Sequence, residues 1–316
     1  MTAAAGFDGG GEGSVAMQRG RIGLALGSGS ARGWAHIGII KGLAELGIRP
    51  DIIAGSSVGA IVGAIHGLGG LEGFEAWIRA LGRKDIISLL DVSFGGGGFF
   101  EGRGLVQTFH KHFGDPDFDA LDLTFAAVAT DLKTGQEVWL REGSVAAAAR
   151  ASMSLPGLFS PVHHNGRWLV DGGLVNPVPV SVCRALGAER VIAVSLNGDI
   201  IGRHLRTRPR QEEADPAWFD RLAAGIRDKA PWFGWSKRQA EDTPPAPGLF
   251  QAIAGSLNIM QDRITRSRMA GDPPDVLLAP RLSRIGLLEF DRGAEAIEEG
   301  EATVRRMAPA LRELLP

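Results

Sequence analysis

The sequence predicts an α/β fold with a mainly parallel central sheet, and three observations carry this prediction. Short apolar runs at 22–26 and 51–54 are each followed by a glycine-containing loop and then by apolar residues at helical spacing. This strand, loop and helix unit occurs twice in succession, and such an order requires parallel strands with helices on the sheet faces. Further strand candidates, separated by helical stretches, extend the pattern to about residue 198.

The individual elements follow in order along the chain. The first unit runs from its strand through the loop at 27–33 to a helix that Gly47 ends. The second runs from its strand through the pentapeptide at 55–59 to a helix of small and β-branched residues that reaches Leu68. The later strand candidates are 125–130, 137–140, 168–170, 191–195 and 276–278, and the later helical candidates include 144–151, 178–186 and 293–311.

Length and composition allow one large domain or two small ones. The chain has 316 residues, of which 44% are hydrophobic, so it can bury a sizeable core. Residues 1–20 have neither a basic opening nor an apolar run, and we expect them to form a flexible tail. We expect residues 21–316 to form one domain that carries an insertion at about 199–256. This insertion is rich in Arg, Pro, Trp and Phe and shows no clean periodicity.

The charge balance argues against a polyanionic partner. Lys and Arg number 34 against 36 Asp and Glu, so the formal net charge is −2 and nucleic-acid binding is not expected. No apolar stretch approaches the roughly 18 to 20 residues of a membrane-spanning helix. We therefore expect a cytoplasmic protein that contacts membranes only from their inner surface. No His, Cys and Asp set has ligand spacing, so neither a metal nor a cofactor is expected.

The pentapeptide Gly55–Gly59 has the form G-x-S-x-G and lies between a strand and a helix. In this context the motif places a serine on a sharp turn, where the following helix can stabilise negative charge near the hydroxyl. Ser57 is therefore the candidate nucleophile. The alternative interpretation is a turn serine without chemistry, because a chain with 45 glycines contains such pentapeptides readily.

The loop at 27–33 is the candidate oxyanion hole. Its small residues allow the backbone N–H groups of Ser28, Gly29 and Ser30 to converge at the start of the next helix. The competing interpretation is a dinucleotide loop, and hence a nucleotide-binding or regulatory protein without turnover. Such a loop expects an acidic residue at the end of the second strand, where this chain has Ser57.

A serine nucleophile also needs a base, and the histidines are poor candidates. His204 lies in a polar run typical of a solvated loop, and His36 is placed as a buried or capping residue of the first helix. A carboxylate can instead act directly on the hydroxyl. Asp171 follows the strand candidate 168–170, at a carboxyl end where the active sites of parallel sheets gather. The same Asp-Gly-Gly tripeptide at Asp8 lies in the tail and lacks this context.

Four ordered motifs resemble those of bacterial patatin-like phospholipases. They are Gly27–Gly33 with Trp34–Gly38, Gly55–Gly59, Ser152–Pro156 with Phe159–Val162, and Asp171–Gly173. The resemblance covers residues 21–198 well and 270–312 more loosely. It implies a three-layer α/β/α fold, a Ser57–Asp171 dyad without a catalytic histidine, and hydrolysis of acyl esters in lipids. Family members often have an unbroken glycine run where this chain has Ser28 and Ser30.

Two further features have open interpretations. Arg32 contacts a substrate phosphate or acyl oxygen in one interpretation and is simply solvated in the other. The aromatic residues of the insertion, among them Trp232 and Trp235, either pack it onto the core or form a lid that faces a membrane.

Overall fold

The computed structural model describes residues 20–82, 85–86, 103–198 and 249–315. The predicted tail up to residue 19 lies outside the described residues, as does most of the predicted insertion, with His204, Trp232 and Trp235.

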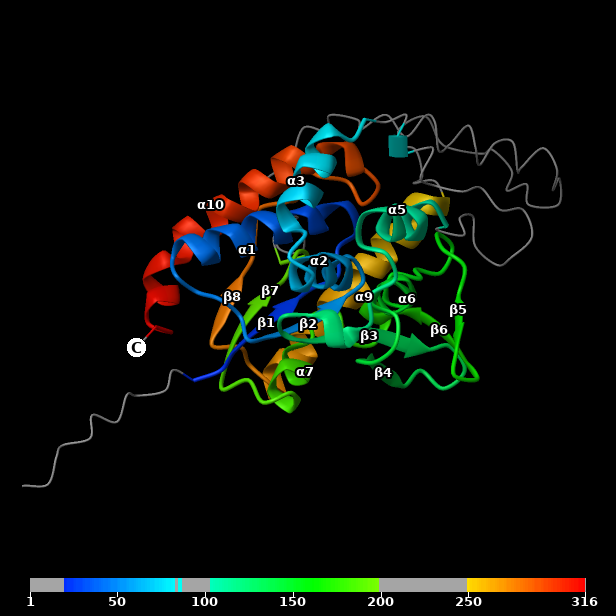
Figure 1. The fold of residues 1–316 in the computed structure, drawn as a ribbon, viewed down its shortest axis with the longest axis horizontal. Helices are drawn as coiled ribbons and strands as arrows, with labels where there is room; N and C mark the ends of the chain where they lie inside the picture. Colours follow the sequence, from blue (N-terminus) through cyan, green and yellow to red (C-terminus); the bar gives the residue numbers. More distant parts are fainter. Residues whose placement is uncertain (1–19, 83–84, 87–102, 199–248, 316) are drawn as a thin grey trace, which may run out of the picture.

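An eight-stranded sheet forms the centre of the described structure, in the order β5-β6-β3-β2-β1-β7-β8, with β4 paired to β3 (Figure 1). Strands β1, β2, β3, β7 and β8 are parallel. Strands β4 and β6 run antiparallel to β3, and β5 runs antiparallel to β6. The bounds are β1 Ile22–Leu26, β2 Ile52–Ser56, β3 Thr124–Asp131, β4 Glu137–Leu140, β5 Val162–His164, β6 Arg167–Asp171, β7 Arg190–Val194 and β8 Val276–Leu278.

Helices cover both faces of this sheet. Their bounds are α1 Ala35–Glu45, α2 Val58–Gly67, α3 Leu71–Ala80, α5 Arg103–Phe113, α6 Val145–Ser152, α7 Val180–Ala185, α9 Leu249–Gly271 and α10 Gly293–Arg312. Short 3₁₀ turns include η1 Ser30–Trp34, η2 Phe118–Ala120, η3 Gly172–Leu174 and η6 Phe290–Arg292.

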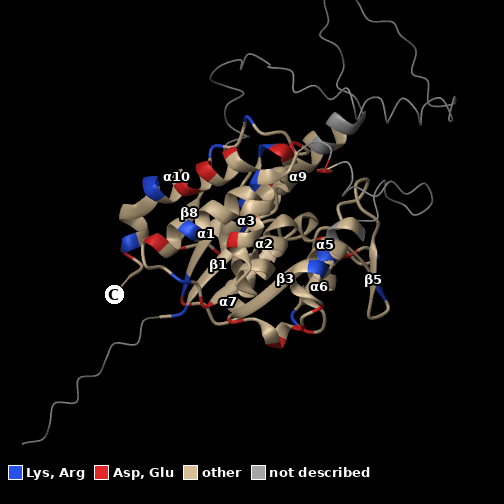
Figure 2. Ribbon diagram, turned by 45° about the horizontal axis from the view of Figure 1, so that its top comes forward, with Lys and Arg blue, Asp and Glu red and all other residues tan. Residues whose placement is uncertain are grey.

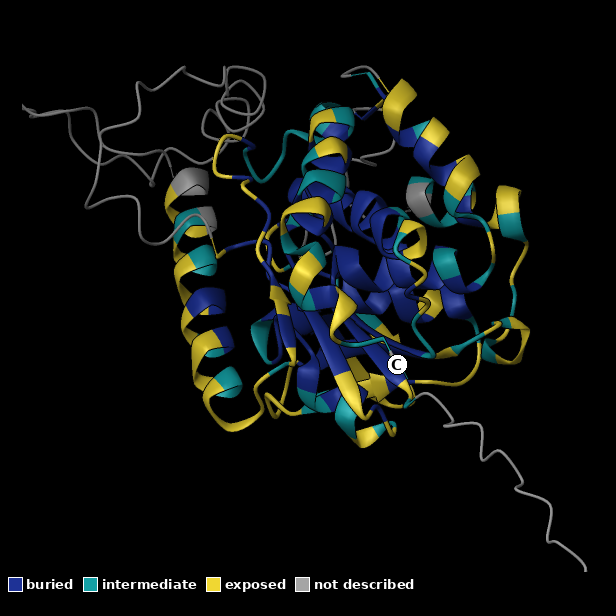
Figure 3. Cartoon of the chain, turned by 90° about the vertical axis from the view of Figure 1, so that its left-hand side faces the viewer, coloured by how far each residue is buried: buried dark blue, intermediate teal, exposed yellow. Residues whose placement is uncertain are grey.

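Two hydrophobic clusters show that the fold has three layers. Leu24 and Leu26 of β1 belong to the cluster on the face covered by α1, α2 and α10. Ala25 between them belongs to the cluster that contains Val182 of α7. Because side chains alternate along a strand, this division puts one helical layer on each face of the sheet. Figure 3 shows the buried strands at the centre and the exposed residues on the outer surfaces of the helices. The predicted α/β/α architecture is therefore confirmed.

Charged side chains of both signs lie on the outer helices, whereas the central strands are almost free of them (Figure 2). They form local ion pairs, such as Arg306 with Glu299 at 2.6 Å on α10 and Lys41 with Glu75 at 2.7 Å between α1 and α3. Within the described ranges, no helix is both long and apolar enough to cross a membrane.

Helix α9 is the main difference from the predicted elements. It spans Leu249–Gly271 and thus takes in the last residues of the predicted insertion. The sequence pattern did not reveal it because its buried side chains are polar: Gln261, Asp262 and Thr265 are buried, while Ile253 and Met260 are exposed. An apolar period of 3.6 residues is therefore missing from this helix.

Candidate active site

Ser57 lies at the turn between β2 and α2. Its backbone has φ 57° and ψ −125°, which are unusual angles for a residue with a side chain. The first turn of α2 packs closely against the end of β1. This is shown by Gly59, where a Cβ atom would collide with the carbonyl oxygen of Leu26. The strained turn holds the Ser57 side chain at the start of the helix, as a nucleophile elbow requires.

The hydroxyl of Ser57 donates a hydrogen bond to Asp171, with 2.6 Å between Oγ and Oδ2. The other carboxylate oxygen of Asp171 accepts a hydrogen bond of 2.7 Å from the backbone N–H of Gly173. The Thr130 hydroxyl of β3 donates a hydrogen bond of 2.8 Å to the main-chain oxygen of Asp171. A Cβ atom on Gly173 would lie 2.6 Å from Ser28 Oγ and 2.9 Å from the Asp171 carboxylate, so this position has no room for a side chain.

Asp171 ends a strand, as predicted, but the expected direction of this strand is wrong. The prediction was the carboxyl end of a parallel strand, whereas β6 is antiparallel to β3. Asp171 pairs with Ala129 near the carboxyl end of β3, and the neighbouring Val128 pairs with Ser56 of β2. Strand β6 overlaps only the last residues of β3, so its own end lies close to the end of β2.

The environment of Asp171 changes its protonation. The side chain is completely buried, and burial raises its pKa to about 6, although the hydrogen bonds from Ser57 and Gly173 act in the opposite direction. At neutral pH the carboxylate is thus largely ionised but is a stronger base than an exposed aspartate. A base of this strength, in contact with a serine hydroxyl, can accept its proton without a histidine.

The glycine-rich loop is held from both sides. His36 donates a hydrogen bond of 2.8 Å from Nε2 to the carbonyl of Gly27, and burial lowers the pKa of His36 to about 4, so its ring is neutral. The N–H of Ser28 donates to the carbonyl of Pro177 at 2.8 Å and is thereby occupied. Among the hydrogen bonds of the described residues, the N–H groups of Gly29 and Ser30 have no acceptor.

Arg32 lies behind this loop and is buried. Its guanidinium donates to the carbonyl of Ile285 at 2.7 Å and to Asn197 Oδ1 at 3.4 Å. Burial lowers the pKa of Arg32 to about 10, opposed by the nearby charge of Glu289, so the group stays charged at neutral pH. Arg32 is therefore neither solvated nor turned toward the cavity, and its position does not support the predicted contact with a substrate phosphate or acyl oxygen.

Three polar residues support the site although no role was predicted for them; one of them, Ser152, begins a motif that carries the family resemblance. Ser152 accepts a hydrogen bond of 2.9 Å from the N–H of Ser57, and its own hydroxyl donates to Val128. Gln261 donates to Ser28 Oγ at 3.2 Å and accepts from Asn197 at 3.1 Å. Asn197 follows β7, and a position after a parallel strand was a usable signal for it. Gln261 had no such signal, because α9 itself was not expected.

A cavity of about 110 Å³ opens at Ser57. Its lining is mainly apolar and includes Ile61, Trp77, Leu155, Leu158 and Phe290, together with Ser28, Gly29, Ser30 and Asp171. This character suits an acyl chain better than a nucleotide. Strand β2 also ends at Ser56 without an acidic side chain, so the geometry gives no support to the dinucleotide interpretation.

Comparisons with known proteins agree with this geometry. An NTE family protein of Mycobacterium tuberculosis is 35% identical over an alignment of 322 positions, which covers 89% of this chain and 89% of that protein. Lysophospholipase nte1 of Emericella nidulans is 27% identical over 289 residues, covering 89% of this chain and 18% of that protein. Neuropathy target esterase sws of Drosophila melanogaster is 35% identical over 182 residues, covering 55% of this chain and 13% of that protein. The family model described as patatin-like phospholipase matches residues 24–184, and the chain belongs to this family.

Proposed function

We propose that this protein hydrolyses acyl esters of lipids, with Ser57 as nucleophile and Asp171 as its base. The hydrogen bond of 2.6 Å between these side chains, at the wall of an apolar cavity, is the observation that carries the proposal. Family membership and the similarity to proteins named lysophospholipase and neuropathy target esterase support lipid hydrolase activity.

The proposed reaction has two halves. Asp171 accepts the proton of Ser57 Oγ as this oxygen attacks the ester carbonyl, and the N–H groups of Gly29 and Ser30 stabilise the oxyanion. The carbonyl re-forms, the carbon–oxygen bond to the alcohol breaks, and the alcohol leaves with the proton from Asp171. Water then attacks the acyl-Ser57 ester with Asp171 as base, which releases the fatty acid and restores the serine.

Arg32 and Gln261 act as positioning residues in this proposal. Ser30 has φ 52°, an unusual backbone angle that surrounding contacts must maintain. Arg32 is bound to the carbonyl of Ile285, and Gln261 is bound to the hydroxyl of Ser28, so both ends of the loop are attached to later parts of the chain. Rigid attachment keeps the N–H groups aimed at the developing oxyanion without reorganisation during the reaction.

We also propose that helix α9 contacts the lipid surface. Ile253 and Met260 are exposed large apolar residues on this helix, while Leu257 and Asn258 line the cavity at Ser57. An exposed apolar stripe beside a cavity mouth is suited to partial insertion between lipids. Ile253→Asp with Met260→Asp should weaken vesicle binding, whereas Leu277→Asp, an exposed apolar position on β8, should not. Equal binding by all variants would contradict this contact.

Labelling with a fluorophosphonate probe tests the nucleophile most directly. We expect the wild-type protein to be labelled and to release fatty acid from lysophospholipid, and Ser57→Ala to do neither. Ser56→Ala is the matched control, because Ser56 is the adjacent serine and its buried hydroxyl has no hydrogen-bond partner among the described residues. Labelling of Ser57→Ala, or a wild-type protein without hydrolysis, would refute the proposal.

A further inference from the structure

A second chamber of about 260 Å³ lies beside the cavity at Ser57. Residues of α2, α3, α5 and α6 line it, and three of its residues, Ile61, Trp77 and Met153, also line the first cavity. The two spaces are therefore neighbours on opposite sides of one wall that is formed by these three side chains.

Helix α2 leads from the nucleophile toward this chamber. Ser57 precedes the helix, Ile61 lines both spaces, and Ile65 lines the second chamber alone. These residues are spaced by four, so they lie on one face of the helix and span about 12 Å along its axis. The apolar lining is thus continuous from Ser57 to the chamber.

Helices α3 and α6 show the same order. On α3 and its C-cap, Leu81 lines the first cavity, Trp77 lines both spaces and Gly73 lines the chamber. At α6, Met153 lines both spaces and Ala149 lines the chamber. Three helices therefore present their side chains in the same sequence, from the reacting serine to the distal chamber.

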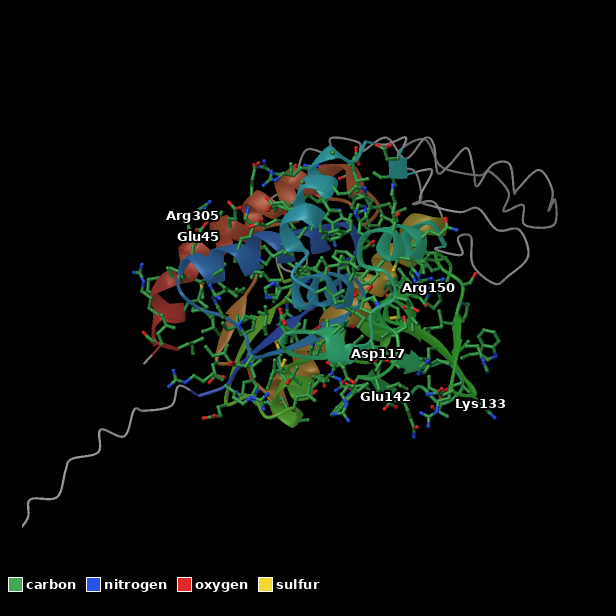
Figure 4. All side chains as sticks on the ribbon, viewed as in Figure 1. Glu45, Asp117, Lys133, Glu142, Arg150 and Arg305 are labelled. Atoms are coloured by element: carbon green, nitrogen blue, oxygen red, sulfur yellow. The ribbon has the colours of Figure 1, made fainter. Side chains whose placement is uncertain are left out.

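Thr108 and Arg150, two of the three polar residues that line the chamber, are already engaged in hydrogen bonds, and the ring of the third, His112, lies against Phe113. The Thr108 hydroxyl donates a hydrogen bond of 2.8 Å to the carbonyl of Gly104 within its own helix. Arg150 of α6, labelled in Figure 4, is buried and donates to Ser154 Oγ at 2.7 Å and to the carbonyl of Ser160 at 3.1 Å. Phe74, Phe109 and Phe113 supply aromatic surface. This lining fits an uncharged apolar ligand that forms few hydrogen bonds.

We propose that the chamber receives the distal part of the acyl chain that is transferred to Ser57. The inference rests on the proposed function, since it requires an ester carbonyl at Ser57. The acyl chain is the occupant because the apolar path begins at the nucleophile, and the chain must extend from there. Short acyl groups end in the first cavity, whereas long ones pass the wall of Ile61, Trp77 and Met153. The chamber thus selects for long acyl chains.

Filling the chamber tests this selection. A Cβ atom on Gly73 would meet no described atom within 4 Å, so Gly73→Phe fits in α3 and narrows the chamber. Gly271→Phe, at the end of α9, has equally open surroundings and is the matched control. We expect Gly73→Phe to lower the ratio of kcat/KM for palmitoyl over butyryl esters by about tenfold or more, because losing the burial of only two methylene groups has an effect of this order. The control should keep the wild-type ratio.

A second variant from the opposite wall, Thr108→Trp on α5, should lower the same ratio. If both variants melt like the wild type and keep its ratio, the chamber does not hold the acyl chain. Equal losses on both esters would also contradict the inference, since a short chain does not reach the chamber. A wild-type protein that hydrolyses neither ester and does not label at Ser57 would instead remove the proposed function, and the inference with it.

Discussion

Two buried aspartates on neighbouring strands have opposite properties. Asp131 ends β3 and Asp171 ends β6, and both side chains are shielded from solvent. The pKa of Asp131 lies below its ordinary value, whereas the pKa of Asp171 is raised to about 6. Residue type and position at a strand end are shared, so the difference must come from the depth of burial and from the groups around each carboxylate.

Asp131 has several donors. Burial alone would raise its pKa, but the backbone N–H groups of Lys133 and Thr134, at 2.9 and 3.1 Å, and the charge of Arg167 more than offset this effect. The carboxylate closes the turn between β3 and β4, where Figure 4 shows Lys133 at the edge of the molecule. Asp131 is thus kept ionised and shapes a turn.

Among the described residues, the Asp171 carboxylate has only the Ser57 hydroxyl and the N–H of Gly173 as donors, and no cation there contributes to its pKa. With few donors, burial dominates and the affinity for a proton rises. The comparison teaches that the balance between depth of burial and stabilising groups, among them a nearby cation, separates a structural carboxylate from one suited to accept a proton.

The largest expected effect is on turnover. Asp171→Asn and Ser57→Ala should each reduce kcat/KM for a lipid ester by about a thousandfold or more, because each removes a member of one catalytic unit. Asp131→Asn, the matched control, should stay close to the wild-type rate. The double variant should be no worse than either single variant. If the losses of kcat/KM in the two single variants multiplied in the double variant, the dyad would be contradicted. If Asp131→Asn lowered kcat/KM as much as Asp171→Asn, the two carboxylates would not differ in role.

The same substitutions should change stability in opposite directions. The native state holds the Asp171 proton more tightly than the unfolded chain, so this group stabilises the fold below about pH 4, and that stability is lost as the pH rises through about 6. At pH 8, Asp171→Asn should therefore raise the free energy of unfolding, by up to about 3 kcal/mol for a pKa raised from 3.8 to about 6.

The contribution of Asp131 to stability depends on pH in the opposite direction. Its lowered pKa means that the ionised form contributes stability above the unfolded-state pKa, and this contribution is lost as the pH falls through the folded-state pKa. Asp131→Asn should lower Tm at pH 8, by an amount that shrinks in acid. Thermal melts of Asp171→Asn and Asp131→Asn across a pH series test these two opposite effects. Shifts of Tm in the same direction at pH 8 would contradict the predicted difference.

The pH dependence of the rate follows from the raised pKa of Asp171. Because the carboxylate must be ionised to accept the Ser57 proton, kcat/KM should fall about tenfold per pH unit below about 6 and level off above it. Asp131→Asn should show the same profile. A profile that stays flat to pH 4 would indicate an Asp171 with an ordinary pKa.

The smallest expected effect concerns the loop. Gln261→Leu removes the hydrogen bonds to Ser28 and Asn197 and should lower kcat about tenfold, in line with the loss of such bonds to a buried partner. Thr265→Val, one turn further along α9 and also buried, is the control. A fall in kcat without a fall in Tm identifies positioning, whereas parallel losses of both would indicate a merely structural residue.

The sequence predicted the parts of the molecule that depend on local patterns. The parallel strands have apolar runs, the turn at Ser57 has a recognisable pentapeptide, and Asp171 follows an apolar strand, so these could be found. The direction of β6 depends on pairing with β3, which no local pattern encodes. Helix α9 could not be predicted because the side chains that it buries are polar, and Gln261 was therefore not recognised as a site residue either.

The attachment of the glycine-rich loop to the last part of the chain has a consequence for fragments. Ser57 and Asp171 both precede residue 199, whereas Gln261 and the carbonyls of Ile285 and Leu287, which bind the loop, follow residue 248. A single cut between 199 and 248 would leave nucleophile and base on one piece and these three anchors of the oxyanion loop on the other. Neither piece alone would contain a complete active site, and any activity would depend on complementation between the two.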